Sequence, residues 1–265
     1  MPPDSTHGVG LDGRLSARQA EILRLVRGLG RLAIADLAGH LAVSEETVRR
    51  DVRPMAAAGV VRKLHGAVVV AAASTEPPLS YRLQENVEAK LRIAAAAAAE
   101  IEDGDSVMLD TGSTTIFVAR ALARRQRLIV VTNSTEVARV LSQTDGSRVF
   151  LAGGEIRSDD AAVFGPQTAT FVAQFVARTA ILSIGGIDPL HGLTDYHVGE
   201  AEFSRAVIPQ VDRVIVVADS TKFQRRGFAR VCGFEEIDML ITDVTPPADA
   251  AARLAEAGVT VVVAD

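Results

Sequence analysis

A short charged helix is the part of the sequence whose residue types point most clearly to a chemical task. Residues 43–52 read V-S-E-E-T-V-R-R-D-V, and Ser44 suits an N-cap because its hydroxyl can accept hydrogen bonds from backbone amides one turn into a helix. At about 100° per residue, Val48 falls on one side of this helix, whereas Arg50 and Arg53 point to the other. The pattern predicts one face in a core and one face of guanidinium groups.

The segments around this helix predict a winged helix-turn-helix. Upstream, the apolar residues of 34–41 recur with the i, i+3, i+4, i+7 spacing of an amphipathic helix, and a further helix is expected at 16–28. Downstream, the β-type runs 60–64 and 67–70 suggest a hairpin. Two helices joined by a tight turn and followed by such a hairpin are typical of this DNA-binding unit, which we place at 14–70.

Charge is distributed unevenly along the chain. The whole sequence is formally −5, with 28 Lys+Arg against 33 Asp+Glu, which does not by itself suggest a nucleic-acid partner. Segment 14–70, however, holds ten Lys+Arg and five Asp+Glu, hence +5, whereas residues 71–265 hold 18 and 26, hence −8. A basic N-terminal segment suits the phosphate backbone of double-stranded DNA.

Side chains of such a helix reach base edges in the major groove, and flanking cations contact phosphates. The residues expected at bases are Ser44, Glu45, Glu46, Thr47 and Arg50, and those expected at the DNA backbone are Arg49, Arg53, Arg62 and Lys63, with His65 in the hairpin. Pro54 predicts a kink or loosening beyond Arg53, because an interior proline costs about 3 kcal/mol. An alternative in which the arginines form only a solvated face is disfavoured by the capped turn and the hairpin.

The remaining composition indicates a globular chain of two domains. With 265 residues and 48% hydrophobic content, the chain can bury one small and one medium core. No apolar run is long enough to span a bilayer and the N-terminal residues do not resemble a signal peptide, so we expect a cytoplasmic protein without a membrane partner. Cys232 is the only cysteine, which excludes an internal disulfide; we expect a buried structural thiol.

The second part of the chain predicts a doubly wound, mostly parallel α/β domain at 81–265, after a proline-containing linker at 71–80 and an alanine-rich helix at 87–101. Apolar β-type runs then alternate with helical segments, which is typical of a parallel sheet covered on both faces. The expected strands are 107–109, 128–131, 149–151, 181–184, 214–218, 239–242 and 259–263.

Polar and glycine-rich residues follow five of these strands, at the sheet edge where such domains bind ligands. Hydroxyls and a glycine at a helix N-terminus can surround a phosphate. The groups are, in strand order, Asp110, Thr111, Gly112, Ser113, Thr114 and Thr115; Asn133 and Ser134; Gly153, Gly154 and Glu155; Gly185 and Gly186; and Asp219, Ser220, Thr221 and Lys222. Together they predict a pocket for a phosphorylated sugar or polyol, with Lys222 as a cation.

Two histidines and a carboxylate, His191, Asp195 and His197, raise the question of a metal site. No helical or fixed-turn spacing holds them together, so neither a metal nor a cofactor is expected.

The succession of motifs resembles the DeoR family of bacterial transcriptional regulators. The motifs are S-E-E-T-V-R-R-D-V, E-P-P-L-S-Y-R-L-Q-E-N, D-T-G-S-T-T, V-T-N-S, L-A-G-G-E-I-R, G-G-I-D and A-D-S-T-K-F, from about Arg14 to the C-terminus. The resemblance implies an operator-binding domain and a sensor of phosphorylated sugars related in fold to ribose-5-phosphate isomerase, with 110–115, Asn133, 153–155 and Lys222 in the effector pocket. Two-fold operators imply at least a dimer and the family suggests tetramers, so we expect a homo-oligomer.

A finer similarity is to the branch of the family that represses the glycerol-3-phosphate regulon. The motifs L-A-G-G-E-I-R-S-D-D, F-V-A-Q-F and D-Y-H carry it. This similarity implies glycerol 3-phosphate as the effector, with its phosphate at 112–115 and Lys222. The residues implied at the polyol end are Asp195, Tyr196, His197 and Glu200.

Two other functions stay open on the sequence alone. The phosphate loop, the carboxylates and Lys222 would suit a sugar-phosphate isomerase, although such an enzyme has no use for a basic N-terminal segment and carries carboxylates where Gly185 and Gly186 stand. A structural DNA-binding protein with an inert second domain would show salt-dependent affinity and little sequence preference. We favour a repressor without catalytic residues, in which effector binding lowers operator affinity.

Overall fold

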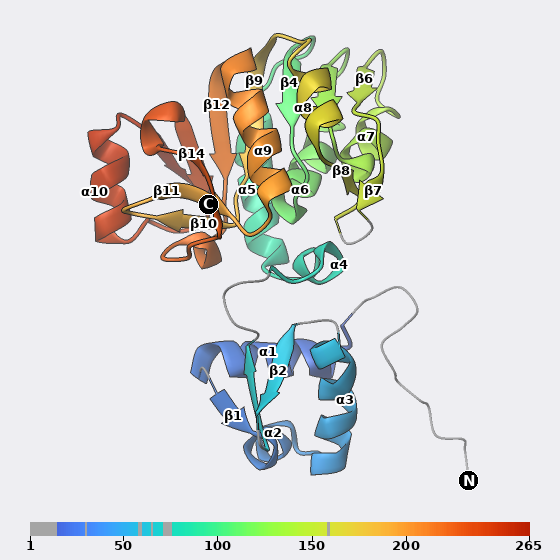
Figure 1. The fold of residues 1–265 in the computed structure, drawn as a ribbon, viewed down its shortest axis with the longest axis vertical. Helices are drawn as coiled ribbons and strands as arrows, with labels where there is room; N and C mark the ends of the chain where they lie inside the picture. The colour runs from blue at the N-terminus through green and yellow to red at the C-terminus, as the bar shows by residue number, and fades with distance from the viewer. Residues whose placement is uncertain (1–14, 30, 58–59, 65, 71–75, 158–159) are drawn as a thin grey trace. The chain divides into compact units, whose positions relative to one another are not determined.

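The computed structural model describes residues 15–29, 31–57, 60–64, 66–70, 76–157 and 160–265, which form two compact units (Figure 1). The division falls between Glu85 and Asn86. Tyr81 is buried in the core of the N-terminal unit, so the segment just before the division packs with that unit although the sequence pattern suggests a second domain from residue 81.

The N-terminal unit is a winged helix-turn-helix, as predicted. Its helices are α1 (Ala17–Leu29), α2 (Ile34–Leu41), α3 (Glu45–Ala57) and the short α4 (Leu79–Arg82), and its strands are β1 (Arg31–Ala33), β2 (Val61–Leu64) and β3 (Ala67–Val70). The strands pair antiparallel in the order β1-β3-β2. The sequence pattern does not predict β1, because three residues are too few for an alternation to show.

Apolar side chains from the three main helices and the sheet fill the core of this unit. They include Ile22, Val26, Leu37, Val48, Val52, Met55 and Val68. The chain turns sharply between α2 and α3, where Ala42 takes a left-handed φ of 51°. The apolar face of α3 is therefore turned into the core, as its periodicity predicts, and its arginine face is left outside.

Pro54 does not end α3. The sequence predicts a kink or loosening beyond Arg53, and the helix continues through Pro54 to Ala57. Proline removes one backbone hydrogen bond, but Val52 and Met55 on either side of it are fully buried. Packing of these two side chains holds the last turn in place.

Polar contacts cap the start of α1, and an ion pair fixes this helix against α3. Ser16 and Gln19 form a reciprocal cap at the start of α1: the Gln19 amide nitrogen donates to Ser16 Oγ at 3.2 Å, and the Ser16 amide nitrogen donates to Gln19 Oε1 at 2.9 Å. Further along, Arg18 forms a two-pronged ion pair with Asp51, whose second prong joins Nη2 to Oδ1 at 3.2 Å. The Asp51 side chain is only 2% exposed, whereas that of Arg18 is 33% exposed.

Replacing Arg18 by alanine is expected to loosen the packing of α1 on α3, because it leaves the buried Asp51 carboxylate without its cation. Losing one partner of a fully buried pair costs about 3–5 kcal/mol, and we expect about 1–3 kcal/mol here because Arg18 is partly exposed. Hydrogen exchange of the α3 amides in the full chain measures the opening free energy. The control is Arg24→Ala, which breaks the exposed pair with Glu21; equal exchange rates in the two variants would contradict the expectation.

The C-terminal unit is built on a seven-stranded sheet in which every pairing is parallel. Its strands are β4 (Ser106–Leu109), β5 (Ile129–Thr132), β6 (Arg148–Leu151), β9 (Ala177–Ser183), β12 (Val211–Val217), β14 (Met239–Thr242) and β15 (Thr260–Val263). All seven strands that the sequence predicts are present. The helices are α5 (Val87–Ala99), α6 (Ser113–Leu122), α7 (Thr135–Leu141), α8 (Pro166–Val172), α9 (Val198–Val207) and α10 (Ala248–Glu256).

The strand order β15-β14-β12-β9-β4-β5-β6 places a topological switch between β4 and β9. From β4 the chain first winds outward through β5 and β6, and then returns to build the other half from β9. In Figure 1, α8 and α9 lie in front of the sheet, and α5 and α6 lie behind it. In such doubly wound domains the crevice for a ligand lies beyond the carboxyl ends of the strands at the switch point.

Two smaller antiparallel elements complete the unit, and neither is predicted by the sequence pattern. One pairs β7 (Ile156–Arg157) with β8 (Ala162–Val163), and the other has the order β10-β11-β13, with β10 (Gly186–Asp188), β11 (Gly192–Asp195) and β13 (Ala229–Cys232). Cys232 is buried and free, as predicted for a structural thiol. Burial, aided by the negative charges of Glu236 and Glu235, raises the pKa of this thiol to about 12.

Candidate DNA interface and effector site

The first turns of α3 present an N-cap and two kinds of arginine. Ser44 Oγ accepts a hydrogen bond from the Thr47 amide nitrogen at 3.2 Å, which confirms the predicted cap. Arg49 is paired along the helix, with Nη2 2.6 Å from Glu45 Oε2 and Nη1 3.8 Å from Glu46 Oε2.

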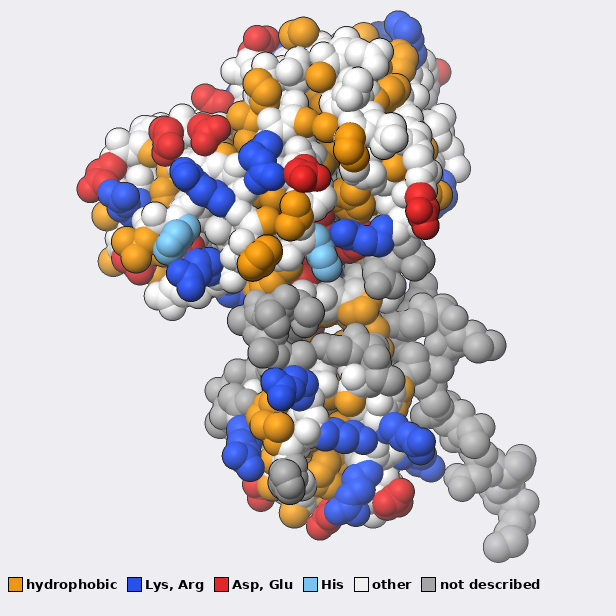
Figure 2. Space-filling view, in the orientation of Figure 1, with side chains coloured by type: hydrophobic (Ala, Val, Ile, Leu, Met, Phe, Trp, Pro, Cys, Tyr) orange, Lys and Arg blue, Asp and Glu red, His pale blue; other side chains and the backbone are white. Residues whose placement is uncertain are grey.

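Arg50 and Arg53 are exposed and form no ion pair or hydrogen bond within the described part of the chain. Their guanidinium groups are therefore open to DNA bases or phosphates, whereas the charge of Arg49 is already partly offset. Arg62 and Lys63 are exposed on β2, and Figure 2 shows Lys and Arg side chains over the visible face of this unit. His65 lies outside the described residues.

At the switch point, the ends of β4 and β9 are joined through Asp110 and Ser183. Asp110 Oδ2 accepts hydrogen bonds from the Ser183 amide nitrogen at 2.9 Å and from Ser183 Oγ at 3.0 Å. Asp110 Oδ1 is buried and has no hydrogen-bond partner among the described residues. Burial raises the pKa of the Asp110 carboxyl well above its ordinary value; the bonds from Ser183 and the Thr115 side chain oppose the rise, and the charge of Glu200 adds to it.

The loop after β4 leads directly into α6, and its hydroxyl residues are buried. Thr111, Ser113, Thr114 and Thr115 are all less than a tenth exposed. A Cβ atom added at Gly112 would lie 2.0 Å from Ser183 Oγ and 2.9 Å from Ser183 Cβ. Glycine is therefore required for β4 and β9 to approach each other here. It also places the N-terminus of α6 at the switch point without a side chain at position 112 beside the helix amides.

The residues after β5 connect the sheet to β8. Asn133 Nδ2 donates to the Val163 carbonyl oxygen at 3.0 Å, and Asn133 Oδ1 is buried without a hydrogen-bond partner among the described residues. Ser134 caps α7, since its Oγ accepts a hydrogen bond from the Val137 amide nitrogen at 3.3 Å. Asn133 thus offers an acceptor near the switch point, whereas the Ser134 hydroxyl serves the helix.

The segment between β11 and α9 contributes a buried acid to the same edge. Asp195 Oδ1 accepts a hydrogen bond from the Gly185 amide nitrogen at 2.7 Å, and a Cβ atom at Gly185 would lie 3.1 Å from the Tyr196 ring. Tyr196 is buried, and His197 is half-buried just before the first turn of α9. Glu200, in that first turn, is also buried.

Two residues that the sequence pattern does not single out, Asn86 and Lys90, join the predicted residues after β12. Asn86 Nδ2 donates to Asp219 Oδ1 at 3.3 Å, and Thr221 Oγ1 donates to the same oxygen at 2.6 Å. Burial alone would raise the pKa of Asp219, but the Thr221 donors and the charges of Lys222 and Lys90 lower it below its ordinary value. Lys90 is a buried cation of α5.

Arg157 is a third residue that the sequence pattern does not single out. It lies on β7, next to Asp160, and its side chain reaches Glu200 on α9. The Thr111 hydroxyl donates to the Asp160 carbonyl oxygen at 3.0 Å, which ties this segment to the loop after β4. The motif L-A-G-G-E-I-R ends at Arg157 and is the one sequence signal for it.

The structure does not bring every predicted residue to the switch point. Gly153, Gly154 and Glu155 follow the edge strand β6 and are exposed, and within the described residues Glu155 forms no hydrogen bond or ion pair. His191 is paired with Asp188 at 2.8 Å, away from Asp195. In the described ranges, no group of three or more His, Cys, Asp or Glu residues is arranged to hold a metal ion.

Comparison with known protein families accounts for both units. Residues 18–73 match the DeoR-like helix-turn-helix domain, and residues 85–244 match the DeoR C terminal sensor domain. The chain belongs to the DeoR family. It is a DNA-binding transcriptional regulator whose second unit is a sensor domain.

Curated relatives of this DeoR-family regulator span nearly its whole length. The glycerol-3-phosphate regulon repressor of Escherichia coli is 34% identical over 87% of this chain and 91% of the relative. The HTH-type transcriptional regulator GlpR of Haloferax volcanii is 34% identical over 92% of this chain and 96% of the relative.

Solved structures are more distant from this DeoR-family regulator. Ribose 5-phosphate isomerase A from Methanocaldococcus jannaschii covers 53% of this chain and 56% of its own, with 18% identity and a TM-score of 0.40. No helix within the described residues is long and apolar enough to cross a membrane.

Proposed function

We propose that this DeoR-family regulator is a repressor whose operator affinity is controlled by a phosphorylated polyol, with glycerol 3-phosphate as the effector. The observation that carries the proposal is the switch point itself, where buried hydroxyls at the N-terminus of α6 occur together with two buried oxygens, Asp110 Oδ1 and Asn133 Oδ1, that have no donor among the described residues. The identity to glycerol-3-phosphate regulon repressors over most of the chain supports this choice of effector.

The phosphate of the effector would bind at the start of α6. This helix has ten residues, and its first amides, together with the hydroxyls of Ser113 and Thr114, form a concentrated set of donors, whereas the Thr115 hydroxyl donates to the Gly112 carbonyl oxygen at 3.1 Å. The positive end of the helix dipole favours an anion at this position. Lys222, after β12, adds a cation from the strand next to β9.

The polyol end would bind to acceptors. Asp110 Oδ1 and Asn133 Oδ1 are buried acceptors without donors among the described residues, and the hydroxyls of a polyol are donors of the right kind. Asp195, Tyr196, His197 and Glu200 follow at the next part of the edge. A buried acceptor without a donor is costly, so supplying one stabilises the bound state.

The N-terminal unit would read the operator through α3. Because operators of helix-turn-helix proteins mirror the two-fold symmetry of the protein, the active form is at least a dimer, and it acts in the cytoplasm where the DNA is. We propose no turnover of the ligand, since the curated relatives are named as repressors or regulators of transcription.

Addition of glycerol 3-phosphate is expected to release the full-length protein from its operator. A gel-shift titration on the DNA upstream of its own gene measures the affinity with and without effector, and a coupling of about 5- to 150-fold is typical of allosteric regulators. Ribose 5-phosphate and glycerol serve as controls for the phosphate and the polyol. Release by ribose 5-phosphate but not by glycerol 3-phosphate would mean that ribose 5-phosphate is the effector. Turnover of ribose 5-phosphate would contradict the assignment as a regulator.

A further inference from the structure

The guanidinium of Arg157 lies between two carboxylates at the effector site. Arg157 Nε is 2.6 Å from Asp160 Oδ2, and Nη2 is 2.5 Å from Glu200 Oε1. The side chains of Asp160 and Glu200 are only 6% and 10% exposed, whereas that of Arg157 is 33% exposed. Arg157 is therefore the member of the cluster that a ligand in solution can reach.

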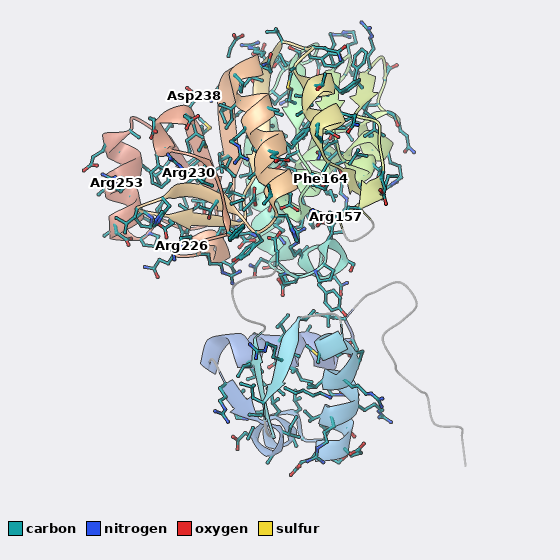
Figure 3. The ribbon with its side chains drawn as sticks, viewed as in Figure 1. Arg157, Phe164, Arg226, Arg230, Asp238 and Arg253 are labelled. Atoms are coloured by element: carbon teal, nitrogen blue, oxygen red, sulfur yellow. The ribbon has the colours of Figure 1, made fainter. Side chains whose placement is uncertain are left out.

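The plane of this guanidinium is fixed by an aromatic ring. The Arg157 Cζ atom lies 4.1 Å from the centroid of the Phe164 ring, and Figure 3 shows the two side chains next to each other beside the end of α9. Phe164 in turn packs on α9, where a Cβ atom at Gly199 would lie 3.1 Å from Phe164 Cβ. The guanidinium of Arg157 is thus stacked on the Phe164 ring, which fixes the direction in which its N–H donors point.

The donors of Arg157 are only partly used. A guanidinium carries five N–H donors in a fork that matches phosphate, and the contacts to Asp160 and Glu200 use Nε and Nη2 once each. Nη1 has no hydrogen bond within the described part of the chain. Arg157 therefore gives one hydrogen bond to each carboxylate, whereas its fork could give a phosphate two parallel ones.

One hydrogen bond attaches the cluster to the predicted phosphate loop, and another attaches the neighbouring β8 to the end of β5. Besides the bond from Thr111 to the Asp160 carbonyl, the Val163 amide nitrogen donates to the Asn133 carbonyl oxygen at 3.0 Å, so β8 is held on the end of β5. Glu200 lies near enough to Asp110 for its charge to act on that carboxyl. Arg157 therefore stands among the side chains that surround the switch point.

We propose that Arg157 binds the phosphate of the effector and that it exchanges its bond to Glu200 for one to the phosphate. The inference rests on the proposed function, because it assigns a further ligand to the same effector. A phosphate dianion competes well for Arg157 because it accepts both N–H groups of the fork, and Glu200 is released at the first turn of α9.

The test is a titration of the full-length protein by isothermal calorimetry with glycerol 3-phosphate and, separately, with inorganic phosphate. Arg157→Gln is expected to weaken the binding of both about tenfold or more, the loss typical of a charge-assisted bidentate contact. Glu200→Gln is expected to tighten the binding of inorganic phosphate severalfold, because it removes the competitor for Arg157. The matched control is Arg139→Gln, which removes an exposed arginine that pairs with Glu136 on α7.

Several outcomes would overturn the inference. Equal affinity of Arg157→Gln and wild type for both probes would show that Arg157 does not bind the phosphate. Weaker phosphate binding by Glu200→Gln would show that the ion pair between Arg157 and Glu200 has a structural role and does not compete with the ligand. If Arg157→Gln does not fold, Arg157→Lys replaces it, with intermediate affinity expected because the charge is kept and the fork is lost. Arg157-dependent binding of inorganic phosphate without binding of glycerol 3-phosphate would retain this inference and overturn the proposed effector; no binding of either probe by wild type would overturn both.

Discussion

Replacing Gly112 by alanine is expected to abolish the response to glycerol 3-phosphate. The new methyl group would collide with Ser183 Oγ and Cβ, so β4 and β9 have to separate, and overpacking of this kind costs about 1–3 kcal/mol of stability. The start of α6 moves with β4 and loses its alignment with the other groups at the switch point. Loss of two charge-assisted hydrogen bonds to phosphate is about 3 kcal/mol or more, roughly a hundredfold in affinity.

Calorimetry gives the effector affinity, and gel-shift titration gives the operator affinity, which is expected to stay near that of wild type. The control is Gly39→Ala, because a Cβ atom at Gly39 in α2 meets nothing within 4 Å. A double variant that adds Ser183→Gly removes both atoms in the way and is expected to recover much of the lost thermal stability. An unchanged effector affinity in Gly112→Ala would show that the phosphate does not bind at the α6 N-terminus.

Replacing Arg50 by alanine is expected to abolish specific operator binding while leaving effector binding intact. Arg50 is exposed, and no ion pair or hydrogen bond within the described residues occupies it, so its removal leaves the stability within about 0.5 kcal/mol of wild type. One good contact to a base edge contributes about 1–3 kcal/mol of discrimination, and a dimer loses it at both half-sites.

Competition gel shifts with operator and random DNA measure this loss as a ratio of affinities. The comparison variant is Arg53→Ala, which is expected to weaken binding to all DNA sequences alike. It should also lower the slope of log affinity against log salt concentration by about one per half-site, because one phosphate contact is lost there. If Arg50→Ala weakened operator and random DNA equally, Arg50 would be a phosphate contact. If it weakened effector binding as well, the division of tasks between the two units would be wrong.

Local patterns in the sequence predict the main sheet well and the small sheets poorly. The seven strands of the parallel sheet are apolar on both faces, so each stands out from the helices around it. Their ends differ from the predicted ones by a few residues; β9, for example, begins at Ala177, because the exposed Arg178 and the buried Thr179 obscure its apolar run. β11 escapes prediction because it is short and pairs with β13 about 40 residues away, as in the pair Leu193↔Cys232.

The same distinction applies to the candidate site. The loop after β4 and Lys222 after β12 can be predicted because the ends of parallel strands share one edge. Ser183, Lys90 and Arg157 cannot be placed from local patterns, since their roles depend on partners far along the chain. The contact between Ser183 and Asp110, for instance, spans 73 residues, and no periodicity reports it.

The long range of that contact bears on the lifetime of the protein. Groups from Asn86 to Lys222 converge on one edge only when β4, β9 and β12 are all in place, so a ligand there binds the folded sheet and not the unfolded chain. At a hundred times its dissociation constant, such a ligand adds about 2.7 kcal/mol to the stability of the fold. Because proteolysis acts on opened copies, abundance of the effector would set how long each regulator survives in the cell as well as whether it occupies its operator.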